Sequence, residues 1–212
     1  MAKHSSGRPP RATAQRMTTE EALATLRAAI AAGEDEAAER AAQALVAVGA
    51  AAVPALLALS SEDDPEARWW ALRVLAEIPH PEVPPRLRAA LHDADPAVRQ
   101  VAAMGLRHQP TPEAVDDLAA LLSGSDRLLA SLAADALAAV GEAATGALIS
   151  ILKEGSPAAQ IEAARALALL GDKRSISALF EALDSPSPIV NYWADEGLER
   201  MGVGMMFFKP GG

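Results

Sequence analysis

The sequence predicts an all-α fold, an α-solenoid built from about six stacked helical hairpins. The first observation behind this prediction is that the phrase Asp-Pro-x-x-Arg begins at Asp64 and begins again at Asp95, 31 residues later. Degraded copies begin at Asp126, Ser156 and Ser187, at further intervals of 31, 30 and 31 residues. A fixed interval of this size is typical of repeat arrays, in which each repeat is one supersecondary unit.

The second observation is that two residue columns keep the same register through six copies, once a weaker copy beginning at Glu34 is included. A Leu lies eleven positions after each start, and an Ala lies four positions before that Leu. The leucines are Leu45, Leu75, Leu106, Leu137, Leu167 and Leu198. The alanines are Ala41, Ala71, Ala102, Ala133, Ala163 and Ala194. We expect both columns to face the interior, because a single hairpin leaves an apolar face bare and stacking covers it.

The third observation is the set of helix start and stop signals inside each copy. In four copies the Asp or Ser at the start is followed by Pro, which suits an N-cap and the first turn of a helix. Those prolines are Pro65, Pro96, Pro157 and Pro188. Three glycines, Gly49, Gly141 and Gly171, are predicted to end helices as left-handed C-caps.

These signals divide each copy into a first helix, a short turn and a second helix. The first helices are predicted over 18–32, 51–60, 81–91, 112–122, 143–153 and 173–183. The second helices are predicted over 35–48, 65–77, 96–107, 127–140, 157–170 and 188–201.

Charge is unevenly distributed along the chain, whose formal net charge is −9. Residues 1–16 carry Lys3, Arg8, Arg11 and Arg16 and no acidic side chain. The other residues hold 15 basic and 28 acidic side chains, a balance of −13. The first segment has too few apolar residues to offset the entropy of ordering, so we predict a disordered basic tail.

The repeat array is predicted to occupy 17–201, followed by a C-terminal tail over 202–212. The tail contains the dense apolar run Met205, Met206, Phe207 and Phe208. We expect this run to fold back and cap the open apolar end of the last repeat, since the ends of repeat arrays need cover. A docking peptide for another subunit is the alternative.

Composition and motif content exclude several classes of function. The chain has no cysteine, which excludes disulfides, thiolate metal sites and a cysteine nucleophile. No apolar run approaches the ~20 residues that a membrane-spanning helix requires, so we predict no membrane span and a cytoplasmic location. The acidic body disfavours nucleic acid as a partner, because phosphate binding needs clustered cations.

Acidic residues recur at the predicted turns, and this recurrence favours helix caps over a metal site. They are Asp63, Asp64, Asp93, Asp95, Asp126 and Asp184. The four histidines lack the spacing of metal ligands, and no phosphate-binding loop or nucleophile motif is present. We therefore predict a non-catalytic protein without a metal or cofactor.

The segment Asp95-Pro-Ala-Val-Arg99 and the following Glu-Ala-Val-x-x-Leu-x-x-Leu-Leu at 113–122 resemble the HEAT repeat, in particular the short bacterial form found in phycobilisome lyase HEAT-like proteins. The resemblance covers about 18–201. It implies that the second helices line the concave face of a superhelix. Arg68 and Arg99 match the arginine that the family carries on this helix, and the other four copies replace it.

Two aromatic pairs, Trp69-Trp70 and Tyr192-Trp193, lie five and six residues after the start of their copies. The first of these positions is polar in three other copies, so we expect Trp69 and Tyr192 to be partly exposed. Exposed aromatics near arginines are common anchors of binding surfaces. The candidate binding residues on the concave face are Arg68, Trp69, Arg73, Arg99, Tyr192 and Trp193. The alternative, that all four aromatics are packing residues, stays open.

Three hypotheses for function follow from these residues and from the resemblance. The first is a scaffold or adaptor that binds another protein along the concave face. The second, implied by the resemblance alone, is a bilin or tetrapyrrole lyase or chaperone. The third is a nucleic-acid-binding protein of the HEAT-like type, which the charge of the body opposes.

Overall fold

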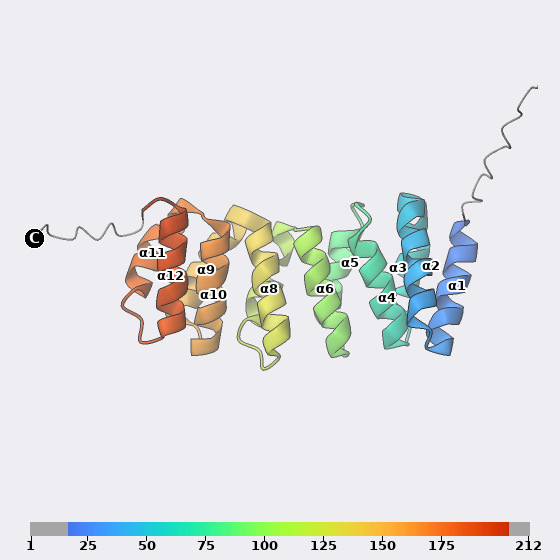
Figure 1. Cartoon of the computed structure of the whole chain (residues 1–212), viewed down its shortest axis with the longest axis horizontal. Helices are drawn as coiled ribbons and strands as arrows, with labels where there is room; N and C mark the ends of the chain where they lie inside the picture. The colour runs from blue at the N-terminus through green and yellow to red at the C-terminus, as the bar shows by residue number, and fades with distance from the viewer. Residues whose placement is uncertain (1–16, 204–212) are drawn as a thin grey trace, which may run out of the picture.

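The structure is a computed structural model that describes residues 17–203, and these residues form helices and turns without a β-strand. The two predicted tails, including the capping run Met205, Met206, Phe207 and Phe208, lie outside the described residues. The predicted all-α solenoid is confirmed, and its helices succeed one another along a single axis (Figure 1).

Six helical hairpins make up the described part of the chain, as the repeat predicted. The first helices, here called A helices, are α1 (Thr19–Ala32), α3 (Val53–Leu59), α5 (Val83–Ala90), α7 (Val115–Leu121), α9 (Thr145–Glu154) and α11 (Ile176–Ala182). The second helices, here called B helices, are α2 (Asp35–Val48), α4 (Pro65–Ala76), α6 (Pro96–His108), α8 (Arg127–Val140), α10 (Pro157–Leu170) and α12 (Pro188–Arg200).

Four of the A helices begin with a 3-10 turn that the sequence did not predict. These turns are η1 (Gly49–Ala52), η2 (Pro112–Ala114), η3 (Gly141–Ala144) and η4 (Lys173–Ser175). Gly171 is the left-handed C-cap that we predicted, with φ 67° and ψ 23°. Gly49 and Gly141 have positive φ but ψ of −140° and −144°, so they are not left-handed caps. At both glycines the chain passes directly from a B helix into the 3-10 turn of the next A helix.

The N-caps follow the sequence prediction in five of the six B helices. Asp64, Asp95 and Asp126 accept hydrogen bonds from backbone amides of the first turn of α4, α6 and α8. Ser156 and Ser187 do the same for α10 and α12. Each side chain satisfies amides that have no partner within the helix.

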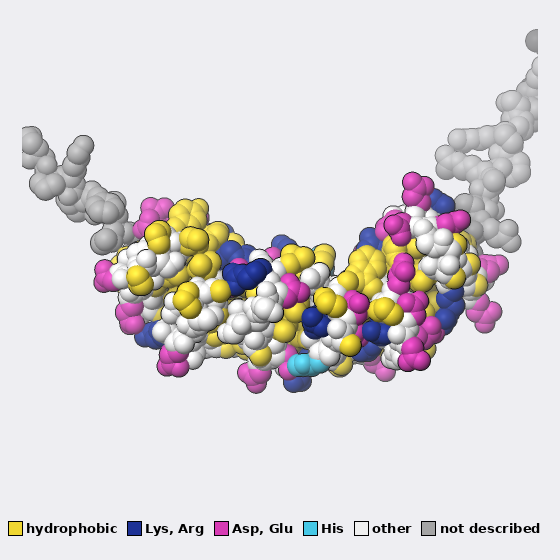
Figure 2. All heavy atoms as spheres, turned by 90° about the horizontal axis from the view of Figure 1, so that it is seen from below, with side chains coloured by type: hydrophobic (Ala, Val, Ile, Leu, Met, Phe, Trp, Pro, Cys, Tyr) yellow, Lys and Arg dark blue, Asp and Glu magenta, His cyan; other side chains and the backbone are white. Residues whose placement is uncertain are grey.

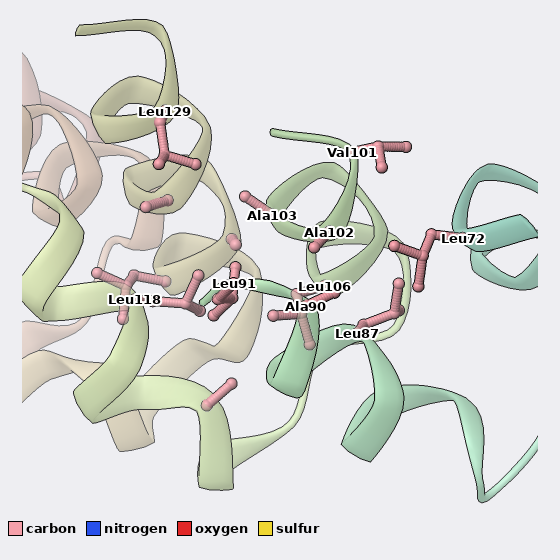
Figure 3. Packing of buried hydrophobic residues seen from close by; sticks show 14 of the residues in the cluster. Leu72, Leu87, Ala90, Leu91, Val101, Ala102, Ala103, Leu106, Leu118 and Leu129 are labelled. Carbon is pink, nitrogen blue, oxygen red and sulfur yellow. The ribbon is translucent and has the colours of Figure 1, made fainter. Parts of the chain in front are cut away.

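The alanine and leucine columns are buried throughout the array. All twelve residues are at most 2% exposed. Figure 3 shows Leu106 of α6 pointing toward Leu87 and Ala90 of α5. The two columns therefore form the seam between the A and B layers, as their spacing predicted.

The array is a crescent with the B helices on its hollow side. Figure 1 looks onto the layer of α4, α6, α8, α10 and α12, and Figure 2, turned by 90°, shows this layer along the upper, concave margin. Successive B helices contact one another from α2 to α12. The structure thus agrees with the concave placement that the family resemblance implied.

Two helical stretches, 35–59 and 127–154, are long and apolar enough to cross a membrane by length and composition alone. Buried helices of folded repeats pass the same test. Each stretch bends at a glycine with positive φ, Gly49 or Gly141, and so consists of two helices of adjacent repeats. The absence of a membrane span stays a prediction.

A close approach of the B helices α12 and α10 gives a test of the stack. A Cβ added at Gly197 of α12 would lie 3.0 Å from the Cα of Ala168 in α10 and 3.1 Å from a methyl of Leu179. We expect Gly197→Ala to lower the free energy of unfolding by about 1–3 kcal/mol, the usual cost of overpacking. Gly146→Ala is the matched control, because its Cβ would meet nothing within 4 Å and Ala favours helix over Gly. Urea denaturation of both variants measures the free energy of unfolding. If Gly197→Ala is as stable as wild type or more stable, the close packing of α12 against α10 is contradicted.

Candidate functional site

One hollow on the concave side lies at the N-terminal ends of α2, α4 and α6. It has a volume of about 830 Å³. Its lining residues are Asp35, Glu36, Glu39, Arg40, Pro65, Glu66, Trp69, Trp70, Asp95 and Ala97. We call it the aromatic hollow. Figure 2 shows hydrophobic side chains on the inner slope of this N-terminal arm, with acidic side chains gathered around them.

Two tryptophans form the apolar part of the aromatic hollow. Trp70 is buried and Trp69 is half-buried, and their rings meet edge to face with centroids 5.0 Å apart. The guanidinium carbon of Arg73 lies 5.3 Å from the ring centroid of Trp70 and 5.9 Å from that of Trp69. These distances are within the range of cation–π attraction, so Arg73 holds the ring pair in place.

Arg73 also links two repeats. Its guanidinium forms a 2.8 Å salt bridge with Glu39 of α2. Hydrogen bonds from Arg73 and then Gln43 hold the pKa of Glu39 below its ordinary value. Glu39 therefore stays ionised at neutral pH, beside the ring of Trp69.

Arg68 has a structural role, which corrects its prediction as a binding residue. Its guanidinium donates two hydrogen bonds to Asp93, at 2.9 and 2.7 Å, and two more to the carbonyls of Glu62 and Asp63. Only 14% of its side chain is exposed. The donors that a partner would need are already used, partly on Asp93 of the next repeat and partly on the turn that precedes α4.

Asp93 is correspondingly an ion-pair residue and not the helix cap that its position at the turn predicted. Burial raises the pKa of Asp93, but hydrogen bonds from Arg68 and from the Asp95 amide outweigh burial and hold this pKa below its ordinary value. Arg99 is half-buried and donates to the carbonyls of Asp93 and Ala94, so it braces the same turn. Both hydrogen bonds come from one guanidinium nitrogen of Arg99, so its role as a binding residue stays a prediction.

The second aromatic pair lies at the other end of the array, on α12. Tyr192 is 59% exposed, Trp193 is half-buried, and their ring centroids are 5.1 Å apart. Three B helices, α6, α8 and α10, separate this pair from Trp69 (Figure 1). The structure therefore does not bring the candidate residues into one pocket, and the two pairs are separate positions along one face.

Sequence reasoning missed a charged network between the B helices α8 and α10. Arg165 of α10 forms salt bridges with Asp135 of α8, at 2.6 Å, and with Glu162, at 3.0 Å. Burial lowers the pKa of Arg165, but these two carboxylates outweigh burial and raise it. The available signal was that Arg165 and Arg73 both lie nine residues after the start of their copies.

The described residues hold no group of three or more His, Asp or Glu side chains arranged for a metal ion. Of the six turn acids considered as metal ligands, Asp64, Asp95 and Asp126 are helix caps and Asp93 is paired with Arg68. What the concave face offers is an extended surface with an aromatic hollow at one end and an exposed tyrosine at the other.

Comparison with known proteins agrees with this architecture. The model of HEAT repeats matches residues 23–107, 53–138 and 145–203. The chain belongs to the HEAT-repeat family. No curated protein matches it in sequence.

Solved HEAT-like and armadillo-like structures share the fold of this HEAT-repeat chain. The complex of CpcE and CpcF of phycocyanin lyase from Nostoc sp. PCC7120 is 24% identical, with a TM-score of 0.56 over 94% of this chain and 82% of that one. A designed armadillo repeat protein in complex with the peptide (KR)4 is 18% identical, with a TM-score of 0.56 over 87% of this chain and all of that one. At these identities the likeness shows the fold alone.

The ion pair between Arg68 and Asp93 gives a pH-dependent test. We expect Arg68→Ala to lower the free energy of unfolding at pH 7 by about 2–3 kcal/mol, because Asp93 would be left largely buried without its partner. The pKa of Asp93 is lowered in the folded chain, so the contribution of its charge is complete above its unfolded pKa of about 4. The difference in the free energy of unfolding between wild type and Arg68→Ala should therefore shrink as the pH falls below about 4.

Lys153→Ala is the control, since its 2.7 Å pair with Glu181 is exposed and should contribute less than about 1 kcal/mol. Urea denaturation across pH 2.5–7 measures both variants. If both variants lose the same free energy of unfolding at pH 7, the pair of Arg68 and Asp93 stabilises the fold no more than an exposed pair does.

Proposed function

We propose that this HEAT-repeat chain is a non-catalytic scaffold that binds another protein along the concave face of its B helices. The observation that carries the proposal is the aromatic hollow, where a half-buried tryptophan lies open on the hollow side of the crescent. Partly exposed aromatic rings in concave sites are the residues that most often dominate protein interfaces. Tyr192 at the far end extends the same face.

The spacing of the two aromatic pairs favours a long partner over a compact substrate. Adjacent packed helices lie about 8–10 Å apart, so α4 and α12 are separated by roughly four such steps along the array. A small molecule cannot contact both Trp69 and Tyr192 at once. A protein segment that lies along the groove can.

A lyase or chaperone for bilins is the alternative, and it is supported by the shared fold with a phycocyanin lyase complex. The charge of the aromatic hollow opposes this alternative. The acidic side chains that line the hollow would repel the two carboxylates of a tetrapyrrole. Incubation with free bilin, followed by absorbance, tests the alternative. The same acidic side chains would repel the phosphates of a nucleic acid, so they also oppose the third hypothesis.

Aromatic truncation tests the scaffold proposal. We expect Trp69→Ala and Tyr192→Ala each to weaken partner binding by more than 1 kcal/mol, about fivefold in Kd, because both remove a large anchor from the concave face. Phe180→Ala is the matched control, since Phe180 is an exposed aromatic, 39% exposed, on the A helix α11.

The measurement is affinity capture from the native cell, followed by titration of the recovered protein against wild type and the three variants. The proposal fails if all three variants bind the recovered protein as wild type does. It also fails if the two concave substitutions lower the melting temperature and leave binding per folded molecule unchanged, because the rings would then be packing residues.

A further inference from the structure

We propose that the aromatic hollow receives a Lys or Arg side chain from an extended, basic segment of the partner protein. This inference rests on the proposed scaffold function and names the chemistry of the segment that binds at its N-terminal end.

The size of the aromatic hollow suits a short stretch of peptide. Its volume of about 830 Å³ lies within the range of roughly 300–1,000 Å³ that is usual for ligand sites. Such a volume holds a few side chains and cannot hold a folded domain. It lies across the N-terminal ends of three successive B helices, so a segment lying along the array would cross it.

The charge of the hollow is strongly negative. Its lining contains five carboxylates and one guanidinium, that of Arg40. The carboxylates belong to Asp35, Glu36, Glu39, Glu66 and Asp95.

These carboxylates are only partly neutralised. Within residues 17–203, neither Asp35 nor Glu66 takes part in a salt bridge. Glu36 lies 3.9 Å from the largely exposed Arg40, which is a weak pair. The hollow therefore attracts a cation.

The tryptophan surface adds a second attraction for the same kind of group. Arg73 already lies over both rings, which shows that their faces accept a guanidinium. Arg73 is not among the lining residues, so the part of Trp69 that faces the hollow is available to a second cation. A Lys or Arg side chain would meet an aromatic ring and carboxylates together, and its aliphatic stem would cover apolar surface.

Other occupants fit these features less well. A second copy of this chain would bring another acidic body, with a charge of −13 outside residues 1–16, against an acidic hollow. An apolar helix would cover Asp35 and Glu66 without supplying partners for their charges, which costs free energy. The chain's own residues 1–16 are also basic, and a chain that lacks them distinguishes this occupant from a partner.

The experiment is calorimetric titration of the full chain with an eight-residue peptide of alternating Lys and Arg. A Gly/Ser peptide of equal length is the neutral comparison. We expect the basic peptide to bind and its affinity to fall as salt is raised, because the attraction is between charges. Binding of the neutral peptide with equal affinity would overturn the proposal.

Matched variants locate the binding. Asp35→Asn/Glu66→Gln removes two charges from the hollow, and Glu154→Gln/Glu199→Gln removes two exposed charges from α9 and α12. We expect the first pair to raise the Kd of the basic peptide at least tenfold and the second pair to change it less than twofold. Trp69→Ala should also raise the Kd at least fivefold. Equal effects of the two charge pairs would mean that the peptide senses only the overall acidity of the chain, and the proposal would fail.

A chain that lacks residues 1–16 tests whether the chain's own basic segment competes with the peptide for the aromatic hollow. If it binds the peptide as the full chain does, the hollow is open to a partner, as proposed. If it binds more than tenfold more tightly, the chain's own N-terminal segment occupies the hollow and the assignment to a partner is overturned.

The same variants, tested with the captured protein, distinguish a failure of the basic-segment proposal from a failure of the scaffold function. If Asp35→Asn/Glu66→Gln retains the captured protein while Trp69→Ala loses it, the scaffold function stands and the basic segment is wrong. If the basic peptide binds at the hollow but no captured protein depends on Trp69 or Tyr192, the scaffold function fails.

Discussion

The structure depends on the packing of one small and one large apolar column between its two helical layers. The alanine column lets the A and B layers approach closely, and the leucine column fills the remaining space in every repeat. Because each hairpin buries this seam only against itself and its neighbours, stability is distributed along the array. The close approach of α12 to α10 at Gly197 shows how little room the stack leaves for larger side chains.

Since the buried positions recur at the repeat period on both helices, the exposed and half-buried B-helix positions can differ from repeat to repeat without changing the fold. Some of them hold ion pairs that join successive repeats, such as Arg68 with Asp93, Arg73 with Glu39 and Arg165 with Asp135. Others carry the aromatic rings of the concave face. The proposed binding surface is therefore built from residues that the repeat pattern does not constrain, and it is acidic and aromatic at one end.

Most of the fold could be predicted from the sequence because burial recurs at the repeat period. The bounds of α2, α8 and α10 match their predicted ranges. The four 3-10 turns were not predicted. Two of them, η1 and η3, begin at Gly49 and Gly141 and depend on how these glycines connect two helices. The site could be predicted only in part. Spacing placed Trp69 and Tyr192 on an outer column, but no local pattern predicts that Arg68 pairs with a carboxylate of the next repeat. Arg68 and Arg99 both donate to carbonyls five and six residues earlier in their own repeat, and stacking supplies only the Asp93 carboxylate that pairs with Arg68.

The most direct test of this account compares two Ala→Leu substitutions on the same helix, α6. Ala102 belongs to the buried column and Ala97 is exposed at the aromatic hollow. If the columns hold the stack, Ala102→Leu should lower the free energy of unfolding by about 1–3 kcal/mol. Ala97→Leu should change it by no more than about 0.5 kcal/mol. Equal stabilities of the two variants in urea denaturation would contradict the claim that the alanine column sets the packing of the array.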